Sequence, residues 1–167
     1  MVILGIDPGY AIVGWGVLEY KNNHFRVIDF GAVTTKAGEY FPQRLLLIYR
    51  QLKEIIERYK PQVLSMEKLY FNSNTTTAID VAQARGVITL VAHECGLQIA
   101  EYTPLQVKQA VVGYGRAEKK QVQEMTRTIL GLSKVPKPDD TADALAMAIC
   151  HGHSAGSLLQ QMKGRTW

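Results

Sequence analysis

The sequence predicts an α/β fold with one mixed five-stranded sheet flanked by helices. Three short apolar segments follow one another within the first 35 residues, and the gaps between them are too short for a crossover helix, so they predict antiparallel strands. After residue 60, two more apolar segments alternate with segments of helical periodicity, as is typical of parallel strands. With 167 residues, of which 47% are hydrophobic, the chain can bury one core.

Turn and capping residues mark where each predicted element begins and ends. The first strand runs into an Asp-Pro-Gly turn at residues 7–9. Pro42 suits the first turn of a helix, Pro61 ends that helix, and Gly96 is placed to end the next one. The predicted strands cover residues 2–6, 13–19, 26–35, 63–67 and 97–102. The predicted helices cover residues 42–59, 77–95, 104–112 and 118–130, and a last helix begins at Asp139 or Asp140.

Composition gives expectations about domain organisation and location. We expect a single domain over residues 1–153 and a frayed tail over residues 154–167, which have little pattern. The net charge of +4 is compatible with a polyanionic partner but does not establish one. No apolar run is long enough for a signal peptide or a membrane span, so no membrane association is expected. Cys95 and Cys150 lack zinc or redox spacing and predict buried free thiols in helices, in a reducing cytoplasm.

Several carboxylates stand where an apolar core would not favour them. Asp7 and Glu67 each end an apolar strand, and Asp143 lies on a mostly apolar face of the last helix, one turn after Asp140. Ordinary explanations exist for most of them: a turn cap for Asp7, a solvent-facing strand end for Glu67, and helix capping for Asp139 and Asp140. Asp143 is harder to explain, because no Lys or Arg lies one turn away in its helix.

Taken together, these acids predict a site for divalent cations. Carboxylates at the ends of separate core elements repel one another unless a cation gathers them, and oxygen ligands suit magnesium or manganese rather than zinc. Two such ions can activate a water molecule and stabilise the leaving oxygen in phosphodiester hydrolysis. The acids therefore favour a two-metal site for phosphoryl transfer. The four histidines, for which the sequence offers no ligand pattern, are treated as non-ligands.

Short motifs in a fixed order also resemble a known family. They are Ile-Asp-Pro-Gly at 6–9, Gly-Trp-Gly-Val at 14–17, Met-Glu at 66–67, Gln-Ala-Arg-Gly at 83–86, Pro-Leu-Gln-Val-Lys-Gln at 104–109, Ala-Glu-Lys at 117–119 and Asp-Thr-Ala-Asp-Ala-Leu-Ala at 140–146. This ordered set resembles the RuvC family of Holliday-junction resolvases and covers nearly the whole chain. The resemblance implies a ribonuclease-H-like fold and a homodimer that nicks two opposed strands of four-way junction DNA. It also implies RuvA and RuvB, the branch-migration proteins, as partners.

The resemblance further implies roles for the acids. Asp7, Glu67, Asp140 and Asp143 match the catalytic, metal-binding acids, which would hold two Mg²⁺ ions, with Mn²⁺ as a substitute. Only the Asp-x-x-Asp spacing selects Asp140 over its neighbour Asp139.

Basic and aromatic residues match further positions of the family. Lys108 and Lys119 match basic positions that are both catalytic and DNA-binding, where they would hold the scissile phosphate. The alternative is that they are surface lysines on polar helix faces. Tyr70 and Phe71 are expected to bind DNA, since an aromatic ring can stack on an unpaired base. Tyr70 matches the family's aromatic position, whereas core packing is the favoured alternative for Phe71. Arg85 is also expected to contact DNA.

The helix that carries Arg85 has two apolar faces, one through Ile79, Ala82, Gly86 and Leu90 and the other through Val81, Ala84, Ile88 and Val91. One face can cover the sheet, which leaves the other for a second subunit in a two-fold dimer.

Three alternatives remain open from the sequence. An actin-like ATPase also uses an Asp-Pro-Gly hairpin, but it needs a second domain half that 167 residues do not supply. A related nuclease fold could act on other structured nucleic acids. A junction-binding module without cleavage would have an incomplete set of acids, and here the set is complete. Cleavage that depends on a divalent metal separates the module from the enzyme.

Overall fold

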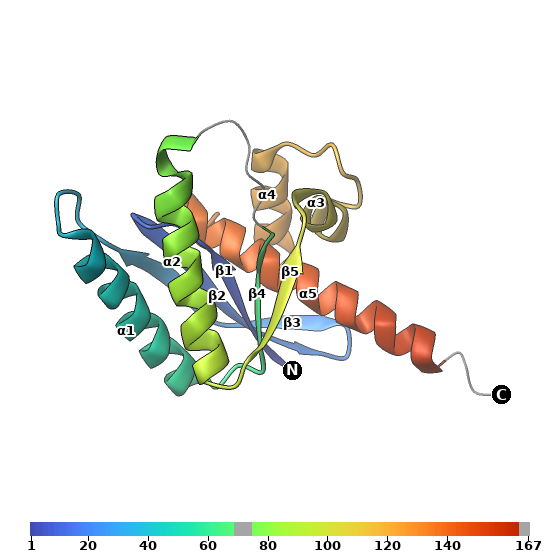
Figure 1. The fold of residues 1–167 in the computed structure, drawn as a ribbon. Coiled ribbons are helices and arrows are strands. Elements are labelled where there is room, and N and C mark those ends of the chain that lie inside the picture. Colours follow the sequence, from blue (N-terminus) through green and yellow to red (C-terminus); the bar gives the residue numbers. More distant parts are fainter. Residues whose placement is uncertain (69–74, 164–167) are drawn as a thin grey trace.

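The computed structural model describes residues 1–68 and 75–163, with side chains given in the second range from residue 77 to residue 155. Its five-stranded sheet has the order β3-β2-β1-β4-β5 (Figure 1). The strands are β1 (Val2–Asp7), β2 (Ile12–Lys21), β3 (His24–Thr34), β4 (Val63–Glu67) and β5 (Gln98–Tyr102). β1, β2 and β3 pair antiparallel, whereas β4 runs parallel to β1 and β5 parallel to β4. The predicted mixed sheet is confirmed.

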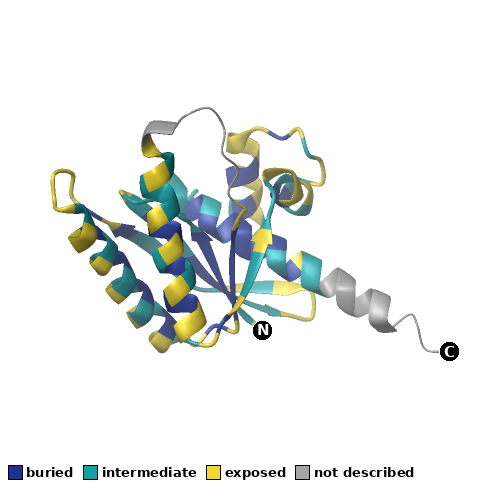
Figure 2. Ribbon diagram, in the orientation of Figure 1, coloured by how far each residue is buried: buried dark blue, intermediate teal, exposed yellow. Residues whose placement is uncertain are grey.

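Helices cover both faces of the sheet (Figure 1). They are α1 (Phe41–Tyr59), α2 (Thr75–Glu94), α3 (Pro104–Val112), α4 (Lys119–Ile129) and α5 (Asp139–Lys163). α1 and α2 pack on one face in a core that includes Leu4, Leu64 and Ile88. α5 lies across the other face, with α3 and α4 packed against it. Figure 2 shows that β1, much of β2, β4 and the sheet-facing sides of the helices are the most buried parts, whereas β3 and β5 are more exposed.

Two glycines let α5 lie close against the sheet. A Cβ atom on Gly5 would stand 2.0 Å from the carbonyl oxygen of Ala144, and one on Gly14 would stand 2.0 Å from that of Asp140. Side chains at these two strand positions would push α5 away, so the helix requires glycine there. The hydroxyl of Ser65, fully buried in β4, also donates to the carbonyl of Met147 at 2.8 Å. These contacts fix α5 across β1, β2 and β4.

Several element boundaries differ from the sequence prediction by one or a few residues. His24, predicted to lie in a turn, instead begins β3, because Asn22 and Asn23 adopt positive φ values of 52° and 61° and close the hairpin in two residues. Cys95 lies just after α2 and is only half-buried, whereas Cys150 is buried in α5 as predicted, and both thiols are free. α5 extends from Asp139 to Lys163.

None of the helices in the described part of the chain combines the length and apolar character needed to cross a membrane.

Candidate active site

The parallel pairing of β1 with β4 brings two of the predicted acids together. Ile6 pairs with Met66, so Asp7 and Glu67, the last residues of the two strands, leave the sheet at the same edge. Parallel strands end on the same side of a sheet, and this places both carboxylates above the same end of the core. Glu67 is exposed, whereas Asp7 is partly buried.

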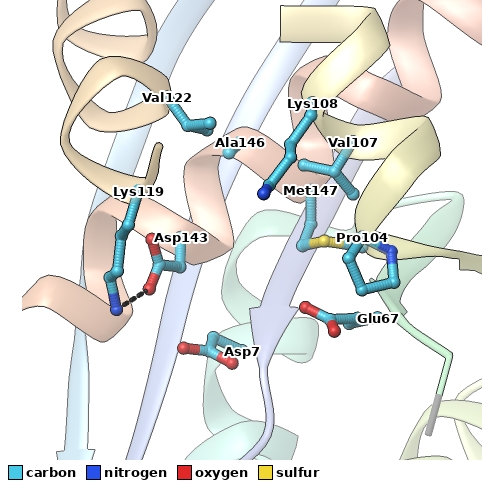
Figure 3. Close-up of a pocket in the computed structure, with 10 residues that line it drawn as sticks. All are labelled: Asp7, Glu67, Pro104, Val107, Lys108, Lys119, Val122, Asp143, Ala146 and Met147. Carbon is cyan, nitrogen blue, oxygen red and sulfur yellow. Dashed lines mark ion pairs between the residues drawn. The ribbon is translucent and has the colours of Figure 1, made fainter. Parts of the chain in front are cut away.

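Asp143 reaches the same place from α5. It lies one turn into the helix, and its side chain, 26% exposed, points toward Asp7 (Figure 3). The close approach of α5 at Gly14 lets the first turns of the helix lie beside the end of β1. Three carboxylates from three separate elements therefore face one another.

Two lysines complete the site from the helices that follow β5. Lys108 is on α3, which begins at a capping box: Thr103 accepts from the Gln106 amide, and the Gln106 side chain accepts from the Thr103 amide. Lys119 is at the start of α4, and its ammonium group lies 2.7 Å from a carboxylate oxygen of Asp143. This contact raises the pKa of Lys119.

These five charged residues line one pocket of about 250 Å³, which we call the acidic pocket (Figure 3). Its remaining wall is mostly apolar and consists of Pro104, Val107, Val122, Ala146 and Met147. Charges beside an apolar wall are poorly solvated, so interactions between them are stronger here than on an open surface.

Electrostatics set Asp7 apart from the other acids. Burial, followed by repulsion from Asp143, Asp140 and Glu67, raises the pKa of Asp7 to about 7, and Lys119 opposes the rise. Although Glu67 is exposed overall, desolvation of its carboxylate and then repulsion from Asp143 raise its pKa as well. The acidic pocket therefore holds more negative charge than its two lysines balance.

The adjacent aspartates at the start of α5 differ in their surroundings. Asp139 pairs with Lys137 at 2.5 Å, which lowers the pKa of Asp139. Asp140 does not line the acidic pocket, yet it lies close enough to Asp7 to raise the pKa of that carboxylate. Asp140 therefore acts on Asp7, whereas Asp139 acts on Lys119, whose pKa it helps to raise.

The structure does not bring all the predicted residues into the pocket. Tyr70 and Phe71 fall outside the described residues. Arg85 is buried on α2, where its guanidinium donates to the carbonyl oxygen of Glu67 at 2.6 Å and pairs with Glu101 of β5. Over residues 1–68 and 75–163, no three acidic, thiol or imidazole groups stand close enough to surround one ion.

Sequence reasoning missed two partners of Asp143. It searched only the helix of Asp143 for a cation, whereas Lys119 comes from another helix. It also overlooked Gln123 of α4, a nearly buried side chain whose amide donates to the other carboxylate oxygen at 3.5 Å. A signal existed in the pattern Lys-Lys-Gln-Val-Gln at 119–123, which places Lys119 and Gln123 one turn apart on the same helix face.

Solved structures share this fold. The Thermus thermophilus RuvC structure matches with a TM-score of 0.87 and 35% identity, over 94% of this chain and 96% of that chain. T. thermophilus RuvC in complex with Holliday junction substrate gives 0.86 and 33%, with the same coverage. The yeast mitochondrial Holliday junction resolvase, at 0.71 and 14%, covers 95% of this chain and 80% of its own and supports the fold alone. The sheet order, the helices on both faces and the acids at its edge define a ribonuclease-H-like domain with a carboxylate site of the nuclease type.

The chain belongs to the RuvC family, because the family profile described as "Crossover junction endodeoxyribonuclease RuvC" matches residues 3–151. The protein of that description from Desulfitobacterium hafniense is 56% identical over 164 residues, which are 98% of this chain and 99% of the relative. The one from Clostridioides difficile is 59% identical over 154 residues, which are 92% of this chain and 91% of the relative.

Proposed function

We propose that this protein is a Holliday-junction resolvase that makes paired, symmetric nicks in opposed strands of four-way DNA junctions during recombination and repair. The observation that carries the proposal is the acidic pocket, in which Asp7, Glu67 and Asp143 from three elements meet Lys108 and Lys119. Membership of the RuvC family supports it, as does the complex of a 33% identical relative with Holliday junction substrate. A cytoplasmic location is proposed as well, because the protein's relatives are bacterial proteins named for action on DNA.

The residues of the pocket fit divalent metal ions. The donors are all oxygens, which suit a hard cation, and the raised pKa of Asp7 reflects repulsion that such a cation would relieve. We infer that Asp7, Glu67, Asp140 and Asp143 hold two Mg²⁺ ions, with Mn²⁺ as a substitute. The bound ions would polarise the scissile phosphate and lower the pKa of a water molecule.

The other residues of the pocket bind and orient the DNA strand. Lys108 and Lys119 face the carboxylates and offer positive charge to a phosphate that enters between them (Figure 3). Lys119 can transfer from Asp143 to that phosphate, which leaves the Asp143 carboxylate to a metal ion. The apolar wall of Val107, Val122 and Met147 excludes bulk water from one side of the reacting group.

We further propose that the aromatic residues after β4 hold the junction open at the cut. Tyr70 and Phe71, which lie outside the described residues, follow Glu67 by only three and four positions in the sequence. Stacking of Tyr70 on an unpaired base would contribute about 1–3 kcal/mol, and Phe71 is the second candidate.

A homodimer would present two acidic pockets to two opposed strands. α2 supports it with a stripe of exposed residues, Ile79, Gln83, Gly86 and Leu90, on the side away from the sheet. Ile79 and Leu90 are 67% and 61% exposed, an unusual position for large apolar side chains. Leu90→Glu should convert a dimer to a monomer in size-exclusion chromatography with light scattering, and a wild-type monomer at high concentration would refute the dimer. RuvA and RuvB are proposed as partners of that dimer.

The function is tested by cleavage of a mobile four-way junction with Mg²⁺ or with a chelator. Wild type should give symmetric, ligatable nicks only with the metal, and Asp7→Asn should bind the junction without cutting it. Tight binding without cleavage under any divalent ion would instead identify a junction-binding module. Cleavage of other branched nucleic acids in preference to four-way junctions would identify a related nuclease of different substrate class.

A further inference from the structure

Arg85 is a buried arginine with two partners that it reaches at once. It lies on the side of α2 that faces the sheet, and 9% of its surface is exposed. One nitrogen of its guanidinium donates to the main-chain oxygen of Glu67 at 2.6 Å, and another pairs with the carboxylate of Glu101. A guanidinium is planar and rigid, so one side chain ties α2, the end of β4 and the end of β5 together.

The bond to Glu67 acts at the point where the chain leaves the sheet. Glu67 is the last residue of β4, and its side chain lines the acidic pocket. On its other side the strand end is held by the amide of Lys68, which donates to the carbonyl of Tyr102 at 2.8 Å. A fixed carbonyl orients the peptide that follows Glu67 and therefore the main-chain position from which its side chain extends into the acidic pocket.

We infer that Arg85 is a positioning residue for Glu67, held in place by Glu101, and that it does not contact DNA. The inference rests on the proposed function, since it assigns how one acid of that active site is aimed.

The surroundings of Arg85 disfavour a direct contact with phosphate. Its side chain is 11% exposed, and the two terminal nitrogens of its guanidinium already have partners. Glu101, whose side chain is 43% exposed, would repel a phosphate that approached from solvent. The cations that do face the acidic pocket are Lys108 and Lys119. Breaking this partly buried charge pair to reach DNA would leave Glu101 without its partner.

The two roles predict different cleavage rates when Glu101 is neutralised. If Arg85 positions Glu67, Glu101→Gln loosens the guanidinium and slows cleavage. If Arg85 contacts DNA instead, Glu101→Gln frees the guanidinium for a phosphate and does not slow cleavage.

The experiment compares Arg85→Gln, Arg85→Lys and Glu101→Gln with wild type in the full-length protein. Glu94→Gln is the matched control, because it removes a carboxylate that pairs with Lys53 across α1 and α2, away from the acidic pocket. Single-turnover cleavage with Mg²⁺ reports the rate, and junction affinity in chelator over a salt series reports DNA contacts. Thermal unfolding sets a temperature at which every variant is folded.

We expect Arg85→Gln to lower the cleavage rate about 10- to 100-fold, as loss of an outer partner of a metal ligand does. Arg85→Lys should not restore the rate, because an ammonium group lacks the fork that joins both partners. Glu101→Gln should show a smaller loss and Glu94→Gln none. Junction affinity and its salt dependence should stay at wild-type values in both Arg85 variants.

Several outcomes would overturn the inference. A salt slope reduced by about 0.9 in Arg85→Gln would identify a lost phosphate contact. An unchanged rate in Glu101→Gln, full rescue by Arg85→Lys, or an unchanged rate in folded Arg85→Gln would each do the same. Wild type that fails to cut any junction would instead refute the proposed function, so the two failures are distinguishable.

Discussion

Replacing Asp7 with Asn should stabilise the metal-free protein while it abolishes cleavage. The pKa of Asp7 is raised from 3.8 to about 7 in the folded protein, so folding disfavours the charged carboxylate. Between these two values the folded state binds more protons than the unfolded state, and stability therefore falls as pH rises from about 4 to about 7. Asn has nearly the same shape and carries no charge, so the variant avoids this loss.

The size of the effect follows from the shift. At about 1.36 kcal/mol for each pKa unit, a rise from 3.8 to about 7 corresponds to about 4 kcal/mol at neutral pH and above. Solvent and salt reach a carboxylate that is only partly buried, so this value is an upper bound. About 3 kcal/mol of it should develop between about pH 5 and pH 8.

Urea unfolding of wild type and Asp7→Asn in chelator, at about pH 5 and pH 8, measures this difference. The advantage of the variant should grow with pH and reach at least about 1 kcal/mol at pH 8. Glu94→Gln, which removes a carboxylate outside the acidic pocket, serves as the control and should show no such gain. An Asp7→Asn variant that is less stable than wild type at pH 8, or whose gain does not depend on pH, would refute the electrostatic argument.

Three further predictions follow from the same geometry. Mg²⁺ at about a hundred times its dissociation constant should raise the free energy of unfolding of wild type at pH 8 by about 2.7 kcal/mol, measured by thermal unfolding. This gain should shrink below about pH 7, because Asp7 becomes protonated there. NaCl of equal ionic strength should not reproduce the effect. Lys119→Gln should leave Asp143 without its cation, raise the pKa of Asp7 further and slow single-turnover cleavage. A wild-type rate would show that Lys119 only neutralises Asp143 in the free protein. Gly14→Ala should lower the free energy of unfolding, measured in urea, by about 1–3 kcal/mol, because its Cβ would meet the carbonyl oxygen of Asp140 at 2.0 Å. A change under about 0.5 kcal/mol would show that α5 can move away from the sheet.

Much of the fold could be predicted because each element carries its own signal. The close spacing of the first three strands allows only antiparallel pairing, and the helical segments between the later strands allow parallel ones. The position of two acids followed from the same reasoning: Asp7 and Glu67 end strands that turned out to be parallel neighbours, so their carboxylates lie at one edge. These inferences need only local periodicity and the geometry of a sheet.

The partners of the acids could not be predicted in the same way. The ion pair of Lys119 with Asp143 joins two helices, and its existence depends on how α4 packs against α5. The same holds for Arg85, expected at the DNA and found beneath the main chain of Glu67. Which residues meet between elements depends on packing and burial rather than on spacing along the chain.

The sequence by itself thus determined the order of strands and helices along the chain and the acids that end two of the strands. Only the tertiary structure decided that Gly5 and Gly14 let α5 approach the sheet, that Lys119 balances Asp143, and that Asp7 is buried among like charges. The physical reason is the range of the interactions. Hydrogen-bonded periodicity acts over a few neighbouring residues, whereas burial and Coulomb forces act between groups that folding alone brings together.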